Sequence, residues 1–575
     1  MRMNTAESAR IRTLPWRVTM GVFVVVLALN LVWLGHAPLA DSTEARHAEV
    51  GREFAEGGPP CGGLVPTLNY RPHLTKPPLT DWLVAVGLIV FGENEFGARF
   101  GNAIVAALGI ALVAGFGCRL GGKHTGLAAA VFWFICPLYL ALSRTISIDI
   151  FLATAAVGAF WAAWEASRME CARPRLAALC WGACLGLGGL AKGHIILLVA
   201  VAPVVVWIVS GKRWHLAKRL LWPPAILLFL AVALPWYLYI HTRFPGWLGA
   251  IVEQEFKQRV IGTRFGNSWK GVAFVCFLGG ALPTVPMAFM PFVRPRNHIP
   301  TRESDKSATV LLWLWLAVPL AVFSMANCQR ANYVIPLLPP AAIMAGLGWS
   351  QLAAQWSRAT RWQRATAYLA AGTLTVCSTG SLLAYITLSP KADGSAITSL
   401  PFFVAGAAAC ALASAACILR LARGRPDRAA AMFLVSAAFL WALSLPLQDV
   451  VKAPRSTRLT SRWIKENLDV ESKVIFCRYY MPSCSFYTGR YLQPFRAKAP
   501  GIEWQQYWQT PGLPPGVATW RDLDHLARLK GGIWLILESQ RLDDIRELKR
   551  ALHLHMDVKQ LDPEVVLAHL FDEPD

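Results

Sequence analysis

Long apolar runs alternate with short polar stretches over the first 447 residues of the chain. The runs are roughly 17–22 residues long, the length that an α-helix needs to cross the ~30 Å hydrocarbon core of a bilayer. We expect about thirteen spanning helices, near residues 18–36, 99–117, 126–142, 149–166, 176–190, 194–210, 221–240, 271–292, 308–324, 333–349, 366–387, 400–419 and 430–447. The first run lacks the short apolar core and cleavage site of a signal peptide, so we interpret it as an uncleaved helix. The apolar segment 79–92 is too short to span and predicts a juxtamembrane helix.

The residues after about 450 have no such runs, and they predict a separate soluble α/β domain. Residues 473–477 and 532–537 are short, apolar and β-branched, which is typical of buried strands. We therefore expect a transmembrane domain over 1–449 and a soluble domain over 450–575. Cys477 and Cys484 lie in this second domain, and an oxidising compartment would permit a disulfide between them.

Composition supports a membrane protein. The chain is 55% hydrophobic and only 16% charged, whereas soluble domains carry about 25% charged residues. The net charge of +21 lies almost wholly before residue 448. It therefore sits between the apolar runs, where it sets topology and meets anionic membrane lipids, rather than on a soluble face that would bind nucleic acid.

The loops between the predicted spans fall into two sets of unequal charge. One alternate set, which begins with residues 1–17, holds 24 Lys and Arg, and the opposite set holds 13 over more residues. The positive-inside rule places the first set, and with it the N-terminus, in the cytoplasm. With an odd number of spans, the C-terminal domain lies outside, which in a bacterial inner membrane is the periplasm.

Charged residues of both signs gather in the loops on the predicted outer side. They occur in the long loops 37–80 and 241–270 and at the ends of other spans, where Asp149, Lys192 and Arg330 lie. Arg and Lys bind phosphate, and carboxylates serve as acid or base or hold a divalent metal. His47 and His73 stand among acids, which makes an outer metal site possible, although metal-ligand spacing is absent. The pattern favours binding of a lipid-linked phosphate at the outer surface.

Several short motifs follow one another in these loops. The first loop contains Glu44-Ala-Arg46-His-Ala-Glu49, then Lys76-Pro-Pro-Leu with Trp82-Leu83, and Gly97-Ala-Arg99 follows. Further along come Ser143-Arg144 with Asp149, Lys192-Gly193, Leu234-Pro-Trp236, Glu255 with Arg259, Phe323-Ser324, and Tyr333-Val-Ile-Pro336. In order and spacing this set resembles the motifs of bacterial lipid A aminoarabinose transferases, within the protein O-mannosyltransferase superfamily of GT-C membrane glycosyltransferases. The resemblance covers roughly residues 40–345.

The resemblance implies a GT-C fold and a transferase that takes a sugar, such as aminoarabinose, from a polyprenyl-phosphate donor. The acceptor would be a lipid A-like molecule or another extracytoplasmic one. The motif matches imply that Arg46, Lys76, Lys192, Arg259, Arg330 and Tyr333 bind the donor phosphate. They also imply acids near the reacting centre: Asp149, and Asp41 or Glu44 from the first loop, with Glu255 as a further polar residue.

The chain departs from the family pattern at three places. Thr43 stands where relatives have the first-loop acid, so the role passes to Asp41 or to Glu44. Thr75 replaces a Glu that relatives often have before the lysine. The usual cation before Tyr333 is absent or shifted to Arg330. These departures leave the donor sugar and the acceptor open.

Other interpretations compete with this one. Asp149 could serve only the dipole of its helix, Lys192 could extend to the membrane interface, and Arg46 with Glu49 could be a simple surface pair. The same fold also supports protein O-glycosyl or mannosyl transfer. A polyprenyl-lipid transporter or flippase would carry ionisable residues in mid-span, and the spans here are nearly free of them. A non-enzymatic scaffold would tolerate loss of the charged loop residues.

Overall fold

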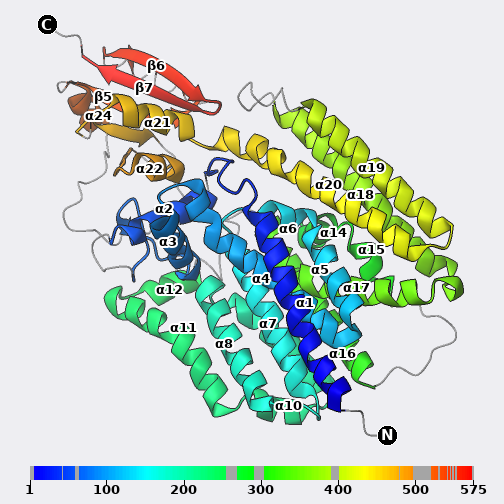
Figure 1. Cartoon of the computed structure of the whole chain (residues 1–575). Coiled ribbons are helices and arrows are strands. Elements are labelled where there is room, and N and C mark those ends of the chain that lie inside the picture. The colour runs from blue at the N-terminus through cyan, green and yellow to red at the C-terminus, as the bar shows by residue number, and fades with distance from the viewer. Residues whose placement is uncertain are drawn as a thin grey trace. The chain divides into compact units, whose positions relative to one another are not determined.

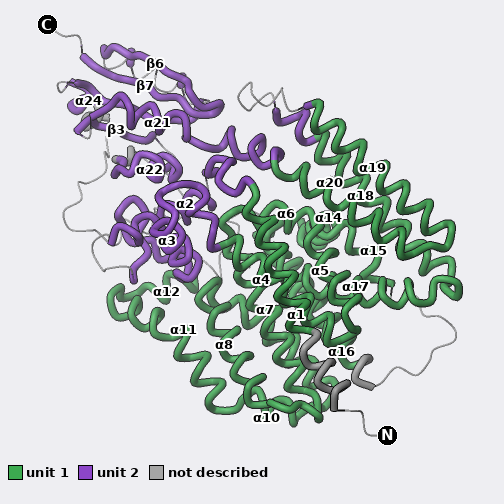
Figure 2. Tube along the Cα trace, viewed as in Figure 1, with its two compact units in different colours: residues 1–32, 102–383, 401–445 green, residues 33–101, 384–400, 446–575 purple. Residues whose placement is uncertain are grey.

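The computed structural model describes residues 5–41, 43–57, 64–253, 269–290, 303–389, 400–469, 471–477, 480–495, 520–528, 531–539, 542–543, 546, 549–550 and 553–572. The chain forms two compact units, coloured in Figure 2. Unit 1 comprises residues 1–32, 102–383 and 401–445, and unit 2 comprises 33–101, 384–400 and 446–575.

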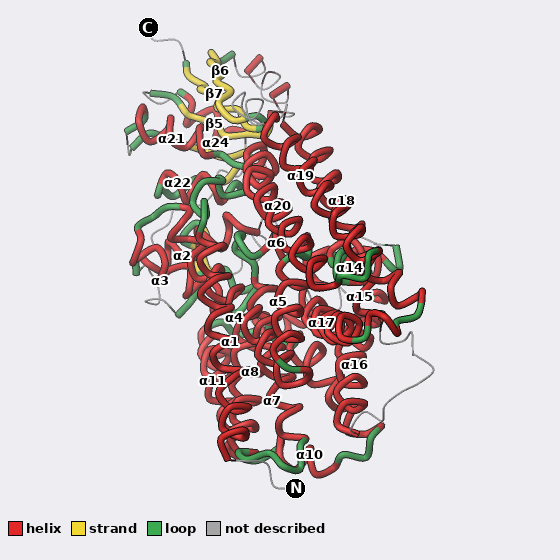
Figure 3. The backbone as a smooth tube through the Cα atoms, turned by 45° about the vertical axis from the view of Figure 1, so that its right-hand side comes forward, coloured by secondary structure: helices red, strands yellow, loops and turns green. Residues whose placement is uncertain are grey.

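Helices dominate unit 1 (Figures 1 and 3). Over the described residues, nine helical segments are long and apolar enough to cross a membrane, which confirms the predicted polytopic α-helical class. They are α4 (Glu95–Gly121), α7 (Ile148–Ser167), α8 (Pro174–Lys192), α11 (Pro223–Arg243), α16 (Glu303–Met325), η4 with α17 (Ala331–Leu337 and Leu338–Ala354), α18 (Arg361–Leu388), α19 (Leu400–Ala422) and α20 (Pro426–Lys452). Helix α1 (Thr5–Leu31) covers residues 18–31 of the first predicted run and ends before the expected boundary at residue 36.

The remaining three predicted spans are interrupted helices. Run 126–142 forms α5 (Lys123–Phe134) and α6 (Pro137–Leu142), and run 271–292 forms α14 (Val272–Gly280) and α15 (Val285–Ala288). Run 194–210 begins with a π-helical turn, η1 (Leu197–Val201), before α9 (Ala202–Ser210). A proline occupies one of the first two positions of α6, α9 and α15. Proline lacks the N–H that a continuous helix needs and clashes with the preceding turn, so hydropathy alone overstates the continuity of these segments.

Small residues allow the helices of unit 1 to pack closely. A Cβ added to Gly182 of α8 would lie 2.1 Å from the carbonyl oxygen of Ala225 in α11, so only glycine permits this approach. Helix α7 is buried along much of its length and carries alanines at Ala153, Ala156, Ala159 and Ala163. The short helices α10 (Trp214–Leu220), α12 (Trp247–Ile251) and η5 (Trp356–Arg358) complete the described helices of this unit.

A five-stranded mixed sheet forms the centre of unit 2. Its strands are β3 (Val474–Cys477), β4 (Gln493–Phe495), β5 (Ile533–Glu538), β6 (His555–Asp562) and β7 (Val565–Phe571), in the order β4-β3-β5-β7-β6. Strand β3 is parallel to β4 and β5, whereas β7 is antiparallel to β5 and β6. Strands β3 and β5 coincide with the two predicted strands. Both faces of β3, β5 and β7 are covered, as expected for strands with nearly continuous apolar sequence, whereas the polar edge strand β6 is largely exposed.

The predicted first outer loop belongs to the same unit as this sheet. It contains α2 (Thr43–Ala55), β1 (Thr67–Leu68) and β2 (Arg71–Pro72), and it leads into α3 (Leu79–Phe91), the expected short juxtamembrane helix. Val50 of α2 and Leu68 of β1 join the apolar cluster formed by Phe476 and Ile536 of the sheet. Helices η8 (Ala453–Arg455), α21 (Arg458–Asn467), α22 (Pro482–Thr488) and α24 (Trp520–Ala527) complete the described elements.

Candidate functional site

A buried charged cluster lies in unit 1 where the ends of three helices meet. Asp149 stands in the first turn of α7, Lys192 is the last residue of α8, and Asn332 lies in η4. Asp149 is only 1% exposed, and the Lys192 side chain is 9% exposed. The Nζ of Lys192 donates to Oδ1 of Asp149, and Nδ2 of Asn332 donates to its Oδ2. Both carboxylate oxygens are therefore engaged, one of them in a buried ion pair.

Tyr333 adds an aromatic face to this group. The Lys192 ammonium lies 4.4 Å from the centroid of the Tyr333 ring, within the range of a cation–π contact. We call Asp149, Lys192, Asn332 and Tyr333 the Asp149 cluster. The sequence singled out three of its members, and the structure brings these three together.

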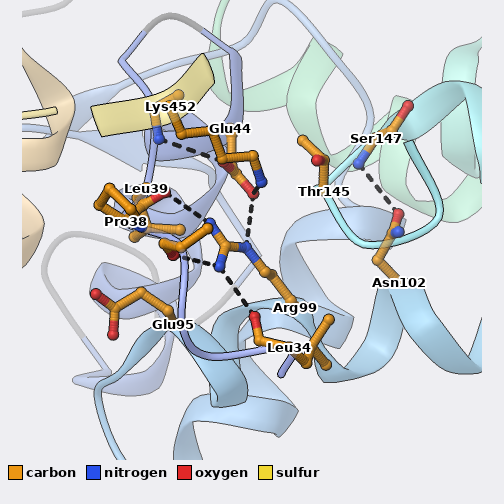
Figure 4. Close-up of polar contacts among 12 residues, drawn as sticks. Leu34, Pro38, Leu39, Glu44, Glu95, Arg99, Asn102, Thr145, Ser147 and Lys452 are labelled. Atoms are coloured by element: carbon orange, nitrogen blue, oxygen red, sulfur yellow. Dashed lines mark hydrogen bonds and ion pairs between the residues drawn. The ribbon is translucent and has the colours of Figure 1, made fainter. Parts of the chain in front are cut away.

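The polypeptide that leads into Asp149 is held by hydrogen bonds. Asn102 of α4 accepts from the backbone N–H of Ser147 at 3.1 Å (Figure 4). Its amide also donates to the carbonyl oxygens of Leu142 and Ser143 at 3.1 and 3.0 Å. Asn102 thus fixes both ends of the 143–148 turn, and the turn sets where α7 begins and where Asp149 points. This residue escaped the sequence analysis because an asparagine within a span carries no local signal for such a role.

The turn before η4 is also tied down. Gln329 accepts from the backbone N–H of Ala273 at 2.7 Å and donates to the carbonyl oxygen of Ala326 at 2.9 Å. The neighbouring Arg330 is exposed. The residue of this motif that contacts Asp149 is Asn332, which the sequence analysis did not select. The sequence could have pointed to Asn332 only through its place next to Tyr333 in the Gln329–Tyr333 motif.

In unit 2, Glu44 is held by two cations. Its Oε1 accepts from Arg99 Nε at 2.8 Å and from Lys452 Nζ at 3.2 Å (Figure 4). Burial by itself would raise the pKa of Glu44, but the charges of Arg99 and Lys452 outweigh it and lower that pKa to about 2. Arg99 also donates to the carbonyl oxygens of Leu34, Ala37 and Pro38 at 3.0, 2.6 and 2.8 Å. Glu44 is thus an ionised anchor for the start of α2.

Asp41 has a different environment within unit 2. It accepts hydrogen bonds from the backbone N–H of Ser483, at 2.8 Å, and from the Ser483 hydroxyl. Burial raises its pKa to about 7, despite the lowering effect of these hydrogen bonds. A carboxyl group that titrates near neutral pH is suited to general acid–base catalysis. Of the two first-loop acids that the sequence selected, Asp41 alone has this property.

Histidines and cations of the first loop form a second polar group in unit 2. His47 Nδ1 lies 2.6 Å from Oδ1 of Asp81, and both side chains are buried. His73 is buried as well, and its pKa is lowered well below the usual value by burial and by the charges of Arg46, His47 and Lys76. The charges of Arg46 and Lys76, the two predicted phosphate ligands of the first loop, thus both act on His73. Asp81 was missed because it lies in the first turn of an apolar helix, where an acid is common.

The remaining predicted residues have other outcomes. Arg259 and Glu255 lie outside the described residues. Glu49 forms a buried ion pair with Arg52 at 2.8 Å. Among the described residues, no group of three His, Cys, Asp or Glu side chains is arranged to hold a metal ion. Cys477 and Cys484 are both buried, and the two are not joined by a disulfide.

Comparison with known proteins places this geometry in context. The sequence model of the family described as dolichyl-phosphate-mannose-protein mannosyltransferase matches residues 75–239. The undecaprenyl phosphate-alpha-4-amino-4-deoxy-L-arabinose arabinosyl transferase of Enterobacter sp. (strain 638) is 26% identical over 339 residues, which are 58% of this chain and 60% of the relative. The protein of the same name from Pseudomonas aeruginosa (strain PAO1) is 28% identical over 347 residues, covering 57% and 59% of the two chains. The matched region thus spans about 60% of the length of these relatives.

The fold has a close counterpart among solved structures. The crystal structure of ArnT from Cupriavidus metallidurans bound to undecaprenyl phosphate matches with a TM-score of 0.79 and 19% identity, over 96% of this chain and 97% of that chain. This match confirms the predicted GT-C fold. Together the three comparisons confirm the resemblance to the aminoarabinose transferases on which the sequence analysis relied.

Proposed function

We propose that this chain, a polytopic membrane protein with the GT-C fold, is a glycosyltransferase that takes a sugar from a polyprenyl-phosphate donor. The observation that carries the proposal is the Asp149 cluster, because a buried lysine–aspartate pair at helix ends is costly in a membrane protein and marks a functional site. The names of the relatives point to undecaprenyl phosphate as the carrier and to aminoarabinose as the sugar. The acceptor is then a lipid A-like molecule at the periplasmic face of the inner membrane.

The chemistry requires that the acceptor oxygen attack the anomeric carbon of the sugar. A carbon–oxygen bond forms there as the bond to the carrier phosphate breaks, and the bonding electrons leave with the phosphate. Cations near the phosphate stabilise this leaving group. In unit 1 we assign the stabilisation of the leaving phosphate to Lys192. Asp149 and the ring of Tyr333 hold its ammonium group in place. Arg46, Lys76, Arg259 and Arg330 are proposed as further phosphate ligands on the basis of their motifs.

The need for a base depends on the acceptor. An ionised phosphate attacks without one, whereas a hydroxyl must lose its proton. Asp149 and Asp41 are the proposed bases, Asp41 because its pKa of about 7 matches neutral pH. Glu44 is ionised and held by two cations, so we assign it a role in positioning α2 instead.

The proposed orientation puts the N-terminus in the cytoplasm and the C-terminal region in the periplasm of a bacterial inner membrane. The support is the excess of Lys and Arg in the loop set that begins at the N-terminus. Cysteine-labelling from either side of sealed vesicles tests this orientation.

A second candidate function is transfer to a protein hydroxyl. It is favoured by the match of residues 75–239 to a family described by its protein mannosyltransferase activity. The two candidates differ in the acceptor and not in the donor chemistry.

The decisive experiment is transfer in proteoliposomes supplied with undecaprenyl-phosphate aminoarabinose and lipid A, followed by mass spectrometry of the acceptor. We expect a mass increase on lipid A that is lost in Lys192→Met and retained in Lys218→Met, a matched change at an exposed lysine of α10. Glycosylation of an added Ser/Thr peptide instead would establish the second candidate. Movement of labelled donor across the bilayer without glycosylation of either acceptor would refute the enzyme in favour of a flippase.

A further inference from the structure

An apolar cavity of about 240 Å³ lies within unit 1, and its lining residues include none of the Asp149 cluster. Helices α5, α18, α19 and α20 contribute most of its wall, and α18, α19 and α20 run side by side in Figures 1 and 3. The lining includes Leu127, Val131, Phe132, Ala370, Leu421 and Phe433. A cavity with such walls accepts a hydrocarbon chain and excludes a charged or sugar-like ligand.

One end of the cavity is bordered by basic residues. Lining residue His124 is preceded by Lys123 at the start of α5. Arg364 lies one helical turn before lining residue Ala367, and Arg428 lies two residues before Ala430. These basic residues lie at the ends of the helices that form the cavity, so the cavity has a basic border at that end.

Direct contacts hold these helix ends together. The hydroxyls of Thr125 in α5 and Ser350 in α17 are 2.8 Å apart. Arg364 donates to the carbonyl oxygen of Trp356 at 3.1 Å, and its guanidinium lies 5.7 Å from the Trp356 ring centroid. A Cβ added to Gly424, in the turn between α19 and α20, would lie 3.8 Å from that same ring. Residues that are distant in sequence thus form one compact, positively charged rim.

The charge of the rim is strongly one-sided. Its segments 123–124, 356–364 and 420–428 contain eight Lys and Arg and a single acid, Asp427. Most of these cations are exposed, namely Lys123, Arg358, Arg361, Arg423, Arg425 and Arg428. Basic pockets between membrane helices on the cytoplasmic side bind the head groups of anionic lipids. The apolar cavity and the basic rim therefore match the two ends of such a lipid.

We propose that this cavity and its rim form a binding site for an anionic phospholipid of the cytoplasmic leaflet. One acyl chain occupies the cavity, and the phosphate lies among the arginines of the rim. The site is distinct in residues and chemistry from the proposed donor site. Anionic lipid bound there fixes the ends of α17, α18, α19 and α20 to one another.

Native mass spectrometry of the full-length protein with short-chain lipids tests the proposal. The probes are dioctanoyl-phosphatidylglycerol and dioctanoyl-phosphatidylcholine, which share acyl chains and differ in net charge. We expect one phosphatidylglycerol molecule to bind per chain. Its affinity should exceed that of phosphatidylcholine by at least about fivefold for each cation that contacts the phosphate. Equal affinity for the two lipids would overturn the proposal.

Two variants separate the rim from the cavity. Arg364→Gln with Arg423→Gln removes two rim cations, and we expect the preference for phosphatidylglycerol to fall by about 25-fold. Ala370→Leu fills the cavity, and we expect it to weaken both lipids. The matched control is Arg173→Gln with Arg175→Gln, two exposed arginines at the start of α8, and it should bind like the parent protein.

Three other outcomes would refute the site. Unchanged lipid binding in Ala370→Leu would show that the acyl chain lies elsewhere. Displacement of phosphatidylglycerol by inorganic phosphate alone would reduce the site to a simple anion site. A lipid-free dimer that disappears in the rim variant would show that a second copy of the chain occupies this surface.

Discussion

The buried pair between Asp149 and Lys192 offers a test that separates folding from function. Removing one partner of a buried ion pair leaves an uncompensated charge and costs about 3–5 kcal/mol. Asp149 is 1% exposed and Lys192 is 9% exposed, so water compensates for little of this loss. Lys192→Met should therefore destabilise the protein by about 3–5 kcal/mol, with the Asp149 charge left to the amide of Asn332.

The double variant Asp149→Asn with Lys192→Met removes both charges at once. Replacement of a buried pair by neutral groups of similar size is often nearly neutral, so we expect stability within about 1 kcal/mol of the parent protein. Each single substitution should cost about 3–5 kcal/mol, so the coupling between the two is at least about 5 kcal/mol in magnitude, measurable by unfolding in mixed micelles with increasing denaturing detergent. If Lys192→Met alone leaves stability unchanged, the inference that this pair is buried and unhydrated is wrong.

Activity of the double variant decides the role of the cluster. Loss of one group that stabilises a leaving phosphate lowers turnover by roughly 10²–10³-fold. We expect a folded double variant whose transfer rate, measured in proteoliposomes, falls by that factor. A folded double variant with parental turnover would show that the cluster only joins α7, α8 and η4.

Three further predictions concern stability and packing. Arg99→Met removes the main partner of Glu44 and four hydrogen bonds, so hydrogen exchange at residues 34–48 should accelerate by a factor equivalent to about 3–5 kcal/mol. Arg528→Met, at an exposed ion pair, should leave local hydrogen exchange nearly unchanged. The pKa of Asp41 is raised from 3.8 to about 7 in the folded state, so the contribution of its protonated form to stability is present below pH 4 and is lost as pH rises through 7. In Asp41→Asn the thermal midpoint should no longer fall with pH for this reason. Gly182→Leu should separate α8 from α11 and lower the thermal midpoint, and an unchanged midpoint would contradict the close approach described above.

Local pattern predicted much of the architecture. Each predicted span corresponds to a helix or to a pair of helical segments, since hydrophobic length is a property of local sequence. Pro137, Pro203 and Pro286 are local signals for the three interruptions. The prediction gave more weight to the apolar length of the runs and therefore treated each run as one helix. The strands at 474–477 and 533–538 were predictable for the same local reason.

Long-range contacts were beyond the reach of the pattern. Nothing in the local sequence indicates that Val50 and Leu68 share a core with Phe476, or that Arg99 pairs with Glu44. In the Asp149 cluster, Lys192 and Tyr333 were predicted from the order of the motifs. The role of Asn332 follows only from the fold, which places η4 against α7 and α8. Asn102 and Asp81 act through hydrogen bonds to residues that are distant in the sequence, and a single sequence does not show such contacts.

Unit 2 is assembled from segments at both ends of the chain, and this has a consequence for biogenesis. Residues 33–101 emerge early, while Lys452, the strand β3 and the other strands of the sheet are synthesised only after most of the helices. At ~5–20 residues per second, this interval is on the order of twenty to seventy seconds. During that time the apolar face of α2 and the Glu44 carboxylate await their partners, so the nascent protein is most open to proteolysis and to chaperone binding at its first loop. A ribosome stalled before residue 446 should leave that loop cleavable, and release of the complete chain should protect it.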